Sequence, residues 1–454
     1  MTQPIFNEET SMTELFAANL QIIQSRWPLA GAILKQQAPG SLDAALVTGQ
    51  NQTISVDGIQ LSSRHNRLAE ARLYIDTLPA GATEVSLYGV GMGDVPSVLL
   101  DSPAISKLTV NILNPAIFAL VLSYTDQSEW LSHPAVTLEL QPGQLKVTQP
   151  YIALIADLEL CSDENARLRD LLVLEQNLPY INRRHQATDP AIIKRLQNNR
   201  PFLLHDPDVI ELKQQVHSHK ALVIGAGPSL EEHYDYLAKL QTQRQRPLII
   251  CADTAMKGLL HHNIRPDIVV CIDGLIGEYH LPLALSKGIA LAYYPRVAPE
   301  ILNGWRGPRF NAYGNSPLYD ALGKEIPKTR LYTNGSVIHP AIDLAVLLGG
   351  REISLLGCDF CYCHNKSHAF WDDFAKTTQD KMTQTWVKCT TQKVQNASHW
   401  VLDGHGQRVA TDLNLRAYLR NLETYIAKRP HVRFYQTSLS GARIKGCQYK
   451  ELKP

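Results

Sequence analysis

Short apolar runs alternate with amphipathic segments along most of this chain. The alternation predicts parallel strands joined by covering helices. In the first third of the chain, strands are expected at residues 84–88, 108–112 and 136–140. In the second half, strands are expected at residues 221–224, 247–252, 268–272, 289–294, 352–356 and 432–435. The hydrophobic pattern therefore predicts an α/β protein with two Rossmann-like parallel-sheet units.

The length of the chain and a change in its hydrophobic pattern predict how it divides into domains. The chain has 454 residues, which is more than one hydrophobic core normally supports. We expect one Rossmann-like domain over residues 1–148 and a second α/β domain over 219–454. Residues 149–218 combine helical periodicity with polar stretches, which predicts a helical connector between the two.

A glycine-rich turn follows the first strand of each predicted unit. These turns are Gly89-Val-Gly-Met-Gly93 and Gly225-Ala-Gly-Pro-Ser229. Small residues let a ligand approach the backbone, and free N–H groups at a helix start attract anions. The first turn resembles the cofactor loop of methyltransferases, but the residues 111–114 after the next strand lack a carboxylate to hold a ribose. We therefore expect the first unit to be a degenerate Rossmann-like domain that binds no cofactor, and the second unit to bind a nucleotide. The alternative for the second glycine turn is a tight strand-to-helix turn without a ligand.

Composition and charge exclude several classes of function. Lys and Arg number 44 against 43 Asp and Glu, so no basic field favours nucleic acid. The polar N-terminus is unlike a signal peptide, and the apolar run at 116–122 is too short for a membrane span. The eight cysteines are scattered as in proteins with reduced thiols, so we expect a cytoplasmic location. The cluster from Cys358 to His364 has no second pair at zinc-site spacing, and we predict no metal site.

Polar residues follow the ends of several predicted strands in the second unit. They are Asp253, Asp273, Arg296, Asn315 and Asp359. The carboxyl ends of parallel strands share one edge of a sheet, and ligands bind at that edge. Carboxylates there can accept hydrogen bonds from ribose hydroxyls or from a base amine. A helix N-cap is the structural alternative for Asp253, which directly precedes a predicted helix.

A second group of polar donors suits the phosphate of a nucleotide. Asn334-Gly335-Ser336 precedes a predicted helix, whose positive dipole end would favour a departing phosphate. The nucleotide-binding set predicted from the glycine turn and this helix start is Gly225, Ala226, Gly227, Ser229, Asn334, Gly335 and Ser336.

The order of these motifs resembles the motility-associated factor (Maf) glycosyltransferases, whose central domain is shared with MptE-like pterin pyrophosphokinases. The matching segments are Gly225–Leu230, Cys251–Gly258, Arg265–Asp273, Tyr313–Pro317, Asn334–Ser336, Gly357–Asp359 and Gly441–Gly446. The resemblance implies an enzyme that moves a nonulosonic acid, of the pseudaminic or legionaminic type, from a CMP-activated donor. The implied acceptor is Ser or Thr of flagellin, and the implied role is in flagellum assembly and motility.

A second resemblance is to bacterial sialyltransferases, which also use CMP donors. Gly357-Cys-Asp-Phe360 and Gly404-His405 are similar to their motifs, and Ala226 stands where their glycine turn has Asn. The resemblance implies a sialyltransferase-like second unit with His405 as general base. It also implies that Tyr362 and His368 lie near the leaving phosphate. No cofactor beyond the sugar donor is implied, and whether Mg²⁺ assists stays open.

Two other functions stay open on the sequence. A 6-hydroxymethyl-dihydropterin pyrophosphokinase would transfer diphosphate from ATP, although the chain has no Gly-x-x-x-x-Gly-Lys-Ser/Thr loop. A non-catalytic nucleotide- or flagellin-binding protein would keep the fold without turnover. His339 competes with His405 as the general base, although its place one turn into a predicted helix suits packing better. The structural alternative for His368 is a histidine in a surface loop.

Overall fold

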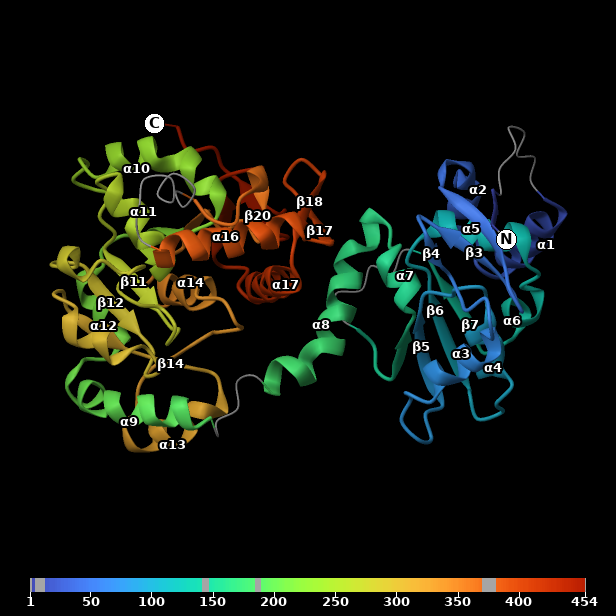
Figure 1. The fold of residues 1–454 in the computed structure, drawn as a ribbon, viewed down its shortest axis with the longest axis horizontal. Helices are drawn as coiled ribbons and strands as arrows, with labels where there is room; N and C mark the ends of the chain where they lie inside the picture. The colour runs from blue at the N-terminus through green and yellow to red at the C-terminus, as the bar shows by residue number, and fades with distance from the viewer. Residues whose placement is uncertain (1, 5–12, 141–146, 184–188, 370–380, 454) are drawn as a thin grey trace. The chain divides into compact units, whose positions relative to one another are not determined.

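The computed structural model describes residues 2–4, 13–140, 147–183, 189–369 and 381–453 (Figure 1). The chain divides into two compact units, Met1–Gln176 and Asn177–Pro454. Each unit buries hydrophobic clusters of its own. Within the described ranges, no helix combines the length and the apolar character needed to cross a bilayer.

The first unit is built on a four-stranded parallel sheet in the order β7-β6-β5-β8. Its strands are β5 (Glu84–Tyr88), β6 (Lys107–Asn111), β7 (Val136–Glu139) and β8 (Tyr151–Ala153). The helices are α1 (Glu14–Arg26), α2 (Pro28–Lys35), α3 (Arg67–Ile75), α4 (Asp94–Leu100), α5 (Pro115–Tyr124), α6 (Ser128–Ser132) and α7 (Ile155–Glu159). The strand order reverses between β5 and β8. This reversal creates a switch point at their carboxyl ends, where open α/β sheets bind ligands.

A small antiparallel sheet also belongs to the first unit, and the sequence did not predict it. Its strands are β1 (Thr2–Pro4), β2 (Ala44–Thr48), β3 (Gln52–Val56) and β4 (Ile59–Gln60). These strands are short, and their hydrophobic alternation is weak. Ile54 and Val56 nevertheless pack in one cluster with Leu120 and Val121 of α5, so the tertiary contact stabilises strands that the local pattern leaves ambiguous.

The predicted connector 149–218 does not form a separate body. β8 pairs with β5, and Leu168 and Leu172 of α8 (Ala166–Arg183) pack in one cluster with Tyr88 of the first unit. Leu203 of α9 (Pro190–His205) packs in the core of the second unit. The boundary expected at residues 148–149 is therefore wrong, because the last strand of the first sheet follows it.

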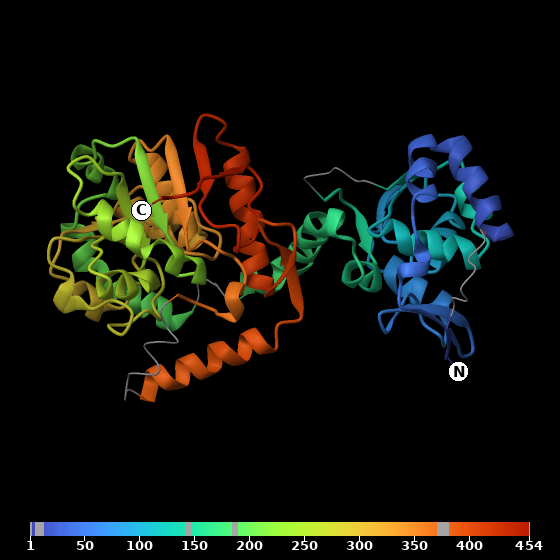
Figure 2. The same cartoon turned by 90° about the horizontal axis from the view of Figure 1, so that it is seen from above.

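The second unit contains an eight-stranded parallel sheet in the order β13-β12-β11-β10-β9-β16-β19-β20. Its strands are β9 (Lys220–Ile224), β10 (Leu248–Ala252), β11 (Ile268–Cys271), β12 (Ala290–Tyr293), β13 (Arg309–Asn311), β16 (Glu352–Leu356), β19 (Arg433–Gln436) and β20 (Cys447–Tyr449). Two strand pairs lie outside this sheet, β14 (Tyr313–Gly314) with β15 (Arg330–Leu331) and β17 (His399–Leu402) with β18 (Arg408–Thr411). Figure 2 shows the green β9 region beside the orange β16, as their pairing requires. The predicted α/β fold with two parallel-sheet units is confirmed.

Helices cover both faces of the large sheet. They are α10 (Tyr234–Leu240), α11 (Met256–His261), α12 (Pro299–Gly304), α13 (Asp320–Glu325), α14 (Ile338–Leu347) and α17 (Leu413–Ala427). A further helix, α16 (Lys381–Gln395), projects away from the sheet (Figure 2). Along β10, Ile249 packs in one core cluster with residues of α10 and α11, and Ile250 packs in another with residues of α14 and α17. Successive strand residues point to opposite faces, which explains the continuous apolar runs in the sequence.

Candidate functional site

The glycine turn after β9 packs closely against the end of β16. The Gly225 N–H donates to Leu356 O at 2.8 Å, and the Gly227 N–H donates to Gly357 O at 2.8 Å. A Cβ at either glycine would overlap Gly357 O. This is the switch point of the large sheet, because β10 lies on one side of β9 and β16 on the other. Both positions therefore require glycine, because a side chain at either one would prevent the close contact between the turn and the end of β16.

Asp359 and Ser229 are brought together, but they bind one another. The Ser229 N–H donates to Asp359 Oδ2 at 2.8 Å, and the Ser229 hydroxyl donates to Asp359 Oδ1. The Cys363 thiol also donates to Asp359 Oδ2, at 3.2 Å. Asp359 and Ser229 are buried, and burial raises the pKa of the Asp359 carboxyl. The expected contact of Ser229 and Asp359 with a nucleotide is thus replaced by an internal contact that fixes the turn.

Asp253 and Asp273 follow the adjacent strands β10 and β11, and their carboxylates interact electrostatically. Asp253 is buried, and its Oδ1 accepts from the Thr254 N–H at 2.7 Å. Burial raises the pKa of Asp253 to about 7, and the charge of Asp273 contributes to the rise. Asp273 is half-buried, and its Oδ1 accepts from the Leu275 N–H at 3.1 Å. The two carboxylates expected at the strand ends therefore lie close enough to interact, and the raised pKa belongs to the buried member, Asp253.

Tyr418 of α17 connects this edge to the start of α14. Gly335 has a φ of +84°, and a Cβ there would lie 2.5 Å from Tyr418 Cε1. His339 Nε2 lies 3.0 Å from the Tyr418 carbonyl oxygen, and burial lowers the pKa of His339 to about 4. Burial raises the pKa of Tyr418, and the charges of Asp412 and Asp273 raise it further. The Asn334–Ser336 segment therefore lies close to Tyr418, whose hydroxyl is in the field of Asp273.

Tyr362 and Asp412 form a defined contact near the same helix. The Tyr362 hydroxyl donates to Asp412 Oδ2 at 2.7 Å, while Asp412 Oδ1 accepts from the Leu415 N–H at 2.8 Å and caps α17. Burial raises the pKa of Tyr362. The phenol is thus held in place at the N-terminus of α17, the helix that also carries Tyr418.

The remaining predicted residues, His405, His368 and Asn315, differ in their exposure to solvent. His405 is exposed at the tip of the β17–β18 hairpin, where its N–H donates to Asp403 Oδ1 at 2.9 Å. His368 precedes Ala369, whose N–H donates to Ala226 O at 2.9 Å, so it lies beside the glycine turn. Burial lowers the pKa of His368 to about 4, with His280 and Lys393 adding to the shift. Asn315 is exposed after β14.

Residues 194–365 match a family model described as "6-hydroxymethylpterin diphosphokinase MptE-like". The predicted MptE-like character of the central segment is confirmed. A 6-hydroxymethyl-7,8-dihydropterin pyrophosphokinase of Methanocaldococcus jannaschii is 39% identical over 67 residues, which are 14% of this chain and 28% of that protein. This chain therefore matches less than a third of that relative's length.

Two solved structures also show similarity. One is a MAf glycosyltransferase from Magnetospirillum magneticum AMB-1, with 16% identity and a TM-score of 0.44, covering 96% of this chain and 74% of that chain. The other is a mammalian sialyltransferase in complex with Gal-beta-1-3GalNAc-ortho-nitrophenol, with 10% identity and a TM-score of 0.28. That similarity covers 59% of this chain and 86% of the other.

Two arginines lie at the same edge of the large sheet, and neither was assigned to the nucleotide site from the sequence. Arg296 follows β12, and its Nε donates to Ile272 O at 2.7 Å. Arg195 of α9 donates from Nη1 to Arg296 O at 3.5 Å, and a Cβ on Gly274 would overlap its guanidinium group. The sequence placed Arg296 at the end of a predicted strand but gave it no role. Nothing local could have identified Arg195, which lies 101 positions from Arg296.

The edge can therefore bind a polar ligand with both hydroxyl and anionic groups. Asp253 and Asp273 offer acceptors, Arg195 and Arg296 offer positive charge, and the Asn334–Ser336 helix start offers donors. Among the described residues, no group of three or more His, Cys, Asp or Glu side chains is arranged to hold a metal ion.

Proposed function

We propose that this chain is a glycosyltransferase that moves a nonulosonic acid from a CMP-activated donor to Ser or Thr of flagellin. The motifs that resemble Maf glycosyltransferases and bacterial sialyltransferases support this proposal. The observation that carries it is the grouping of Asp253, Asp273 and Tyr418 with the Asn334–Ser336 helix start at one sheet edge. A nucleotide monophosphate linked to an acidic sugar has hydroxyl and anionic groups to match them.

In this proposal, the second unit holds the two ends of the donor separately. Asp273 accepts hydrogen bonds from the ribose, with Asp253 behind it. The Asn334–Ser336 segment stabilises the phosphate, because the N-terminus of α14 has a favourable dipole. Arg296 and Arg195 attract the anionic groups of the donor, including the sugar carboxylate.

Transfer would proceed by a single displacement with inversion. The acceptor hydroxyl oxygen attacks the anomeric carbon, the bond from that carbon to the phosphate oxygen breaks, and CMP leaves. Tyr362, oriented by Asp412, and His368 would donate hydrogen bonds to the departing phosphate. His405 would take the proton of the acceptor hydroxyl, a role worth about 10²–10⁴-fold in rate for a positioned base.

A second candidate function is pterin pyrophosphokinase activity, favoured by the family match over residues 194–365. Such an enzyme would bind ATP and transfer diphosphate to a pterin. The two functions differ in the nucleotide they need, so nucleotide binding separates them.

Thermal unfolding of the purified chain with CMP, CTP, AMP and ATP plus Mg²⁺ tests the proposal. CMP should raise the unfolding temperature more than AMP or ATP does. A preference for ATP with Mg²⁺ would instead support the pyrophosphokinase, and no shift with any nucleotide would support a non-catalytic protein. The Asp273→Asn variant should reduce the CMP-dependent shift.

The role of His405 is tested by His405→Ala. We expect the variant to keep CMP binding and lose transfer by at least about 10²-fold, because the general base is missing. Mass spectrometry of flagellin incubated with the CMP-sugar measures transfer. His431→Ala, an exposed histidine on the turn before β19, serves as the control. Unchanged transfer by the His405 variant would remove His405 from the mechanism.

A further inference from the structure

The first unit contains a cavity at the switch point of its own sheet. The cavity has a volume of about 370 Å³, within the range of roughly 300–1,000 Å³ found for small-molecule sites. It lies where β5 and β8 end, between the turn at 90–95, the segment 154–159, helix α3 and residues 59–62. Open α/β sheets bind ligands at this position. The proposed transferase function does not use this cavity.

The glycine turn beside this cavity is not available to a phosphate. Asp157 accepts the Val90 N–H at 2.9 Å and the Gly91 N–H at 3.1 Å. A Cβ at Gly89 would overlap the Asp157 side chain, so the turn closes around that carboxylate. An internal carboxylate therefore takes the place that a ligand anion occupies in a nucleotide-binding turn.

The arginine in the wall is also fully engaged. Arg67 donates from Nε to Asp94 at 2.8 Å, from Nη1 to Gln52 O at 3.2 Å and from Nη2 to Met92 O at 3.3 Å. Its charge is balanced by Asp94. Among the described residues that line the cavity, no other positive group remains for an anionic ligand.

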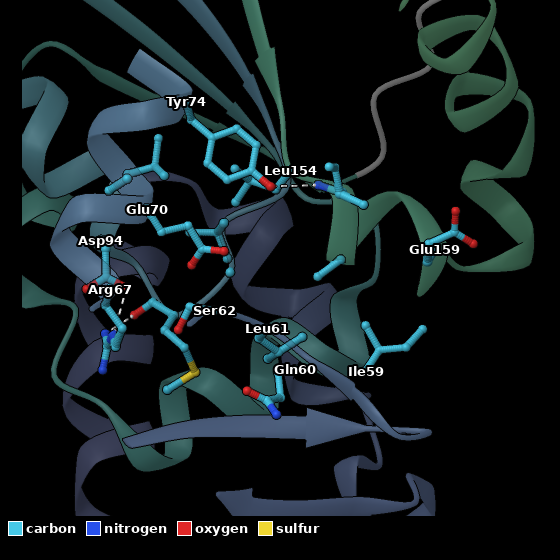
Figure 3. A pocket seen from close by; sticks show the side chains of 17 residues that line it. Ile59, Gln60, Leu61, Ser62, Arg67, Glu70, Tyr74, Asp94, Leu154 and Glu159 are labelled. Atoms are coloured by element: carbon cyan, nitrogen blue, oxygen red, sulfur yellow. Dashed lines mark hydrogen bonds and ion pairs between the residues drawn. The ribbon is translucent and has the colours of Figure 1, made fainter. Parts of the chain in front are cut away.

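Two carboxylates that form no ion pair within the described ranges line the cavity, the half-buried Glu70 and the exposed Glu159, and Glu70 is the one held in the wall. Its Oε2 accepts the Ser63 N–H at 2.7 Å, and no cation pairs with it in the described part of the chain. Figure 3 shows the Glu70 carboxylate directed into the space below the Tyr74 ring. The charges of Glu70 and Asp157 both act on the Tyr74 hydroxyl. A half-buried carboxylate without a partner cation favours a positively charged ligand.

Most of the remaining wall is apolar, although Gln60, Ser62 and Glu159 also line the cavity. The apolar part is formed by Ile59, Leu61, Met92, Val95, Leu154 and Ile155. Ile155 is 64% exposed at the edge of the cavity, so apolar surface continues to the mouth. The aromatic ring of Tyr74 lies above Glu70 and can attract a cation through its face (Figure 3).

We propose that this cavity binds an organic cation, an amine or guanidinium group on an apolar body. The cationic group pairs with Glu70 beneath Tyr74, and the apolar body lies against Leu61, Leu154 and Ile155. A free amine and a Lys or Arg side chain of a protein share this chemistry.

Calorimetric titration of the full chain tests the proposal with three compounds of matched shape. Phenethylamine is the cation, 2-phenylethanol is the neutral compound and 3-phenylpropionate is the anion. We expect phenethylamine to bind at least tenfold more tightly than the other two. Glu70→Gln should reduce that binding at least tenfold, while Glu84→Gln, at the opposite end of β5, should change it less than twofold. Equal binding of all three compounds, or no binding of phenethylamine, overturns the proposal.

Hydrogen exchange of the wild-type chain gives a readout that needs no variant. Phenethylamine should slow exchange at residues 67–75 and 154–159, and protection confined to the second unit contradicts the proposal.

Blocked Gly-Lys-Gly and Gly-Arg-Gly peptides, titrated in parallel, distinguish a free amine from a protein side chain as the source of the cation. Tighter binding of a peptide than of phenethylamine identifies a protein side chain as the ligand. CMP titrated into the same samples reports on the second unit, so the transferase proposal is judged separately.

Discussion

At the scale of single residues, each glycine turn is completed by an aspartate from elsewhere in its own unit. Asp157 accepts two amide N–H groups of the first turn, and Asp359 accepts the amide and the hydroxyl of Ser229 in the second. The sequence predicted where the turns lie, because a strand and small residues mark them. It could not predict these partners, because Asp157 and Asp359 lie 67 and 130 positions from the amides they accept.

Asp157 makes the stability of the first unit depend on pH. Burial raises its pKa to about 6, whereas an aspartate in an unfolded chain has a pKa near 3.9. The folded state therefore binds the proton more tightly, and the stability gained from the protonated form is lost as pH rises through about 6. The difference of about 2 units corresponds to roughly 3 kcal/mol between pH 4 and pH 7.

The Asp157→Asn variant isolates this effect, because asparagine does not titrate. We expect the stability advantage of the wild type over the variant to fall by up to about 3 kcal/mol between pH 4 and pH 7. Urea unfolding at several pH values, followed by the buried Trp130, measures the difference. The exposed Asp43→Asn serves as the control. An advantage that stays constant with pH would contradict the assignment.

At the scale of elements, most strands of the two parallel sheets were predicted closely, but β8, β13 and β20 were missed. β5 was predicted at residues 84–88 and is observed there, and β16 was predicted at 352–356 and is observed there. Strands buried on both faces have continuous apolar runs, and such runs are readable without a structure. β2, β3 and the β17–β18 hairpin were also missed, because these strands are short and their apolar alternation is weak.

Contact between the glycine turn and β16 explains why Gly227 is needed. Its φ is −68°, a conformation that any residue adopts, so the requirement is space and not backbone freedom. A Cβ would overlap the Asp359 carboxylate and lie 2.7 Å from Gly357 O. We expect Gly227→Ala to lower the free energy of unfolding of the second unit by about 1–3 kcal/mol.

Gly277→Ala is the matched control for this substitution. A Cβ at Gly277 has nothing within 4 Å, so its effect should stay within about 0.5 kcal/mol. Urea denaturation of both variants and the wild type measures the two values. Equal stability of the Gly227 variant and the wild type would show that the turn is looser than the structure indicates.

At the scale of the whole molecule, the candidate site combines residues from distant parts of the second unit. The sequence identified Asp253, Asp273 and the Asn334–Ser336 segment, because each follows a strand or precedes a helix. It did not identify Arg195 or Tyr418, whose contribution depends on how α9 and α17 pack against the sheet. The domain boundary was misplaced for a similar reason, since β8 joins its sheet only through long-range pairing.

A crystal structure of the full chain with CMP tests the central claim most directly. The account predicts CMP at the carboxyl ends of β10 and β11, with its ribose at Asp273 and its phosphate at the Asn334–Ser336 helix start. CMP bound away from this edge, or an edge that binds ATP with Mg²⁺ and leaves CMP in solution, would contradict the transferase account.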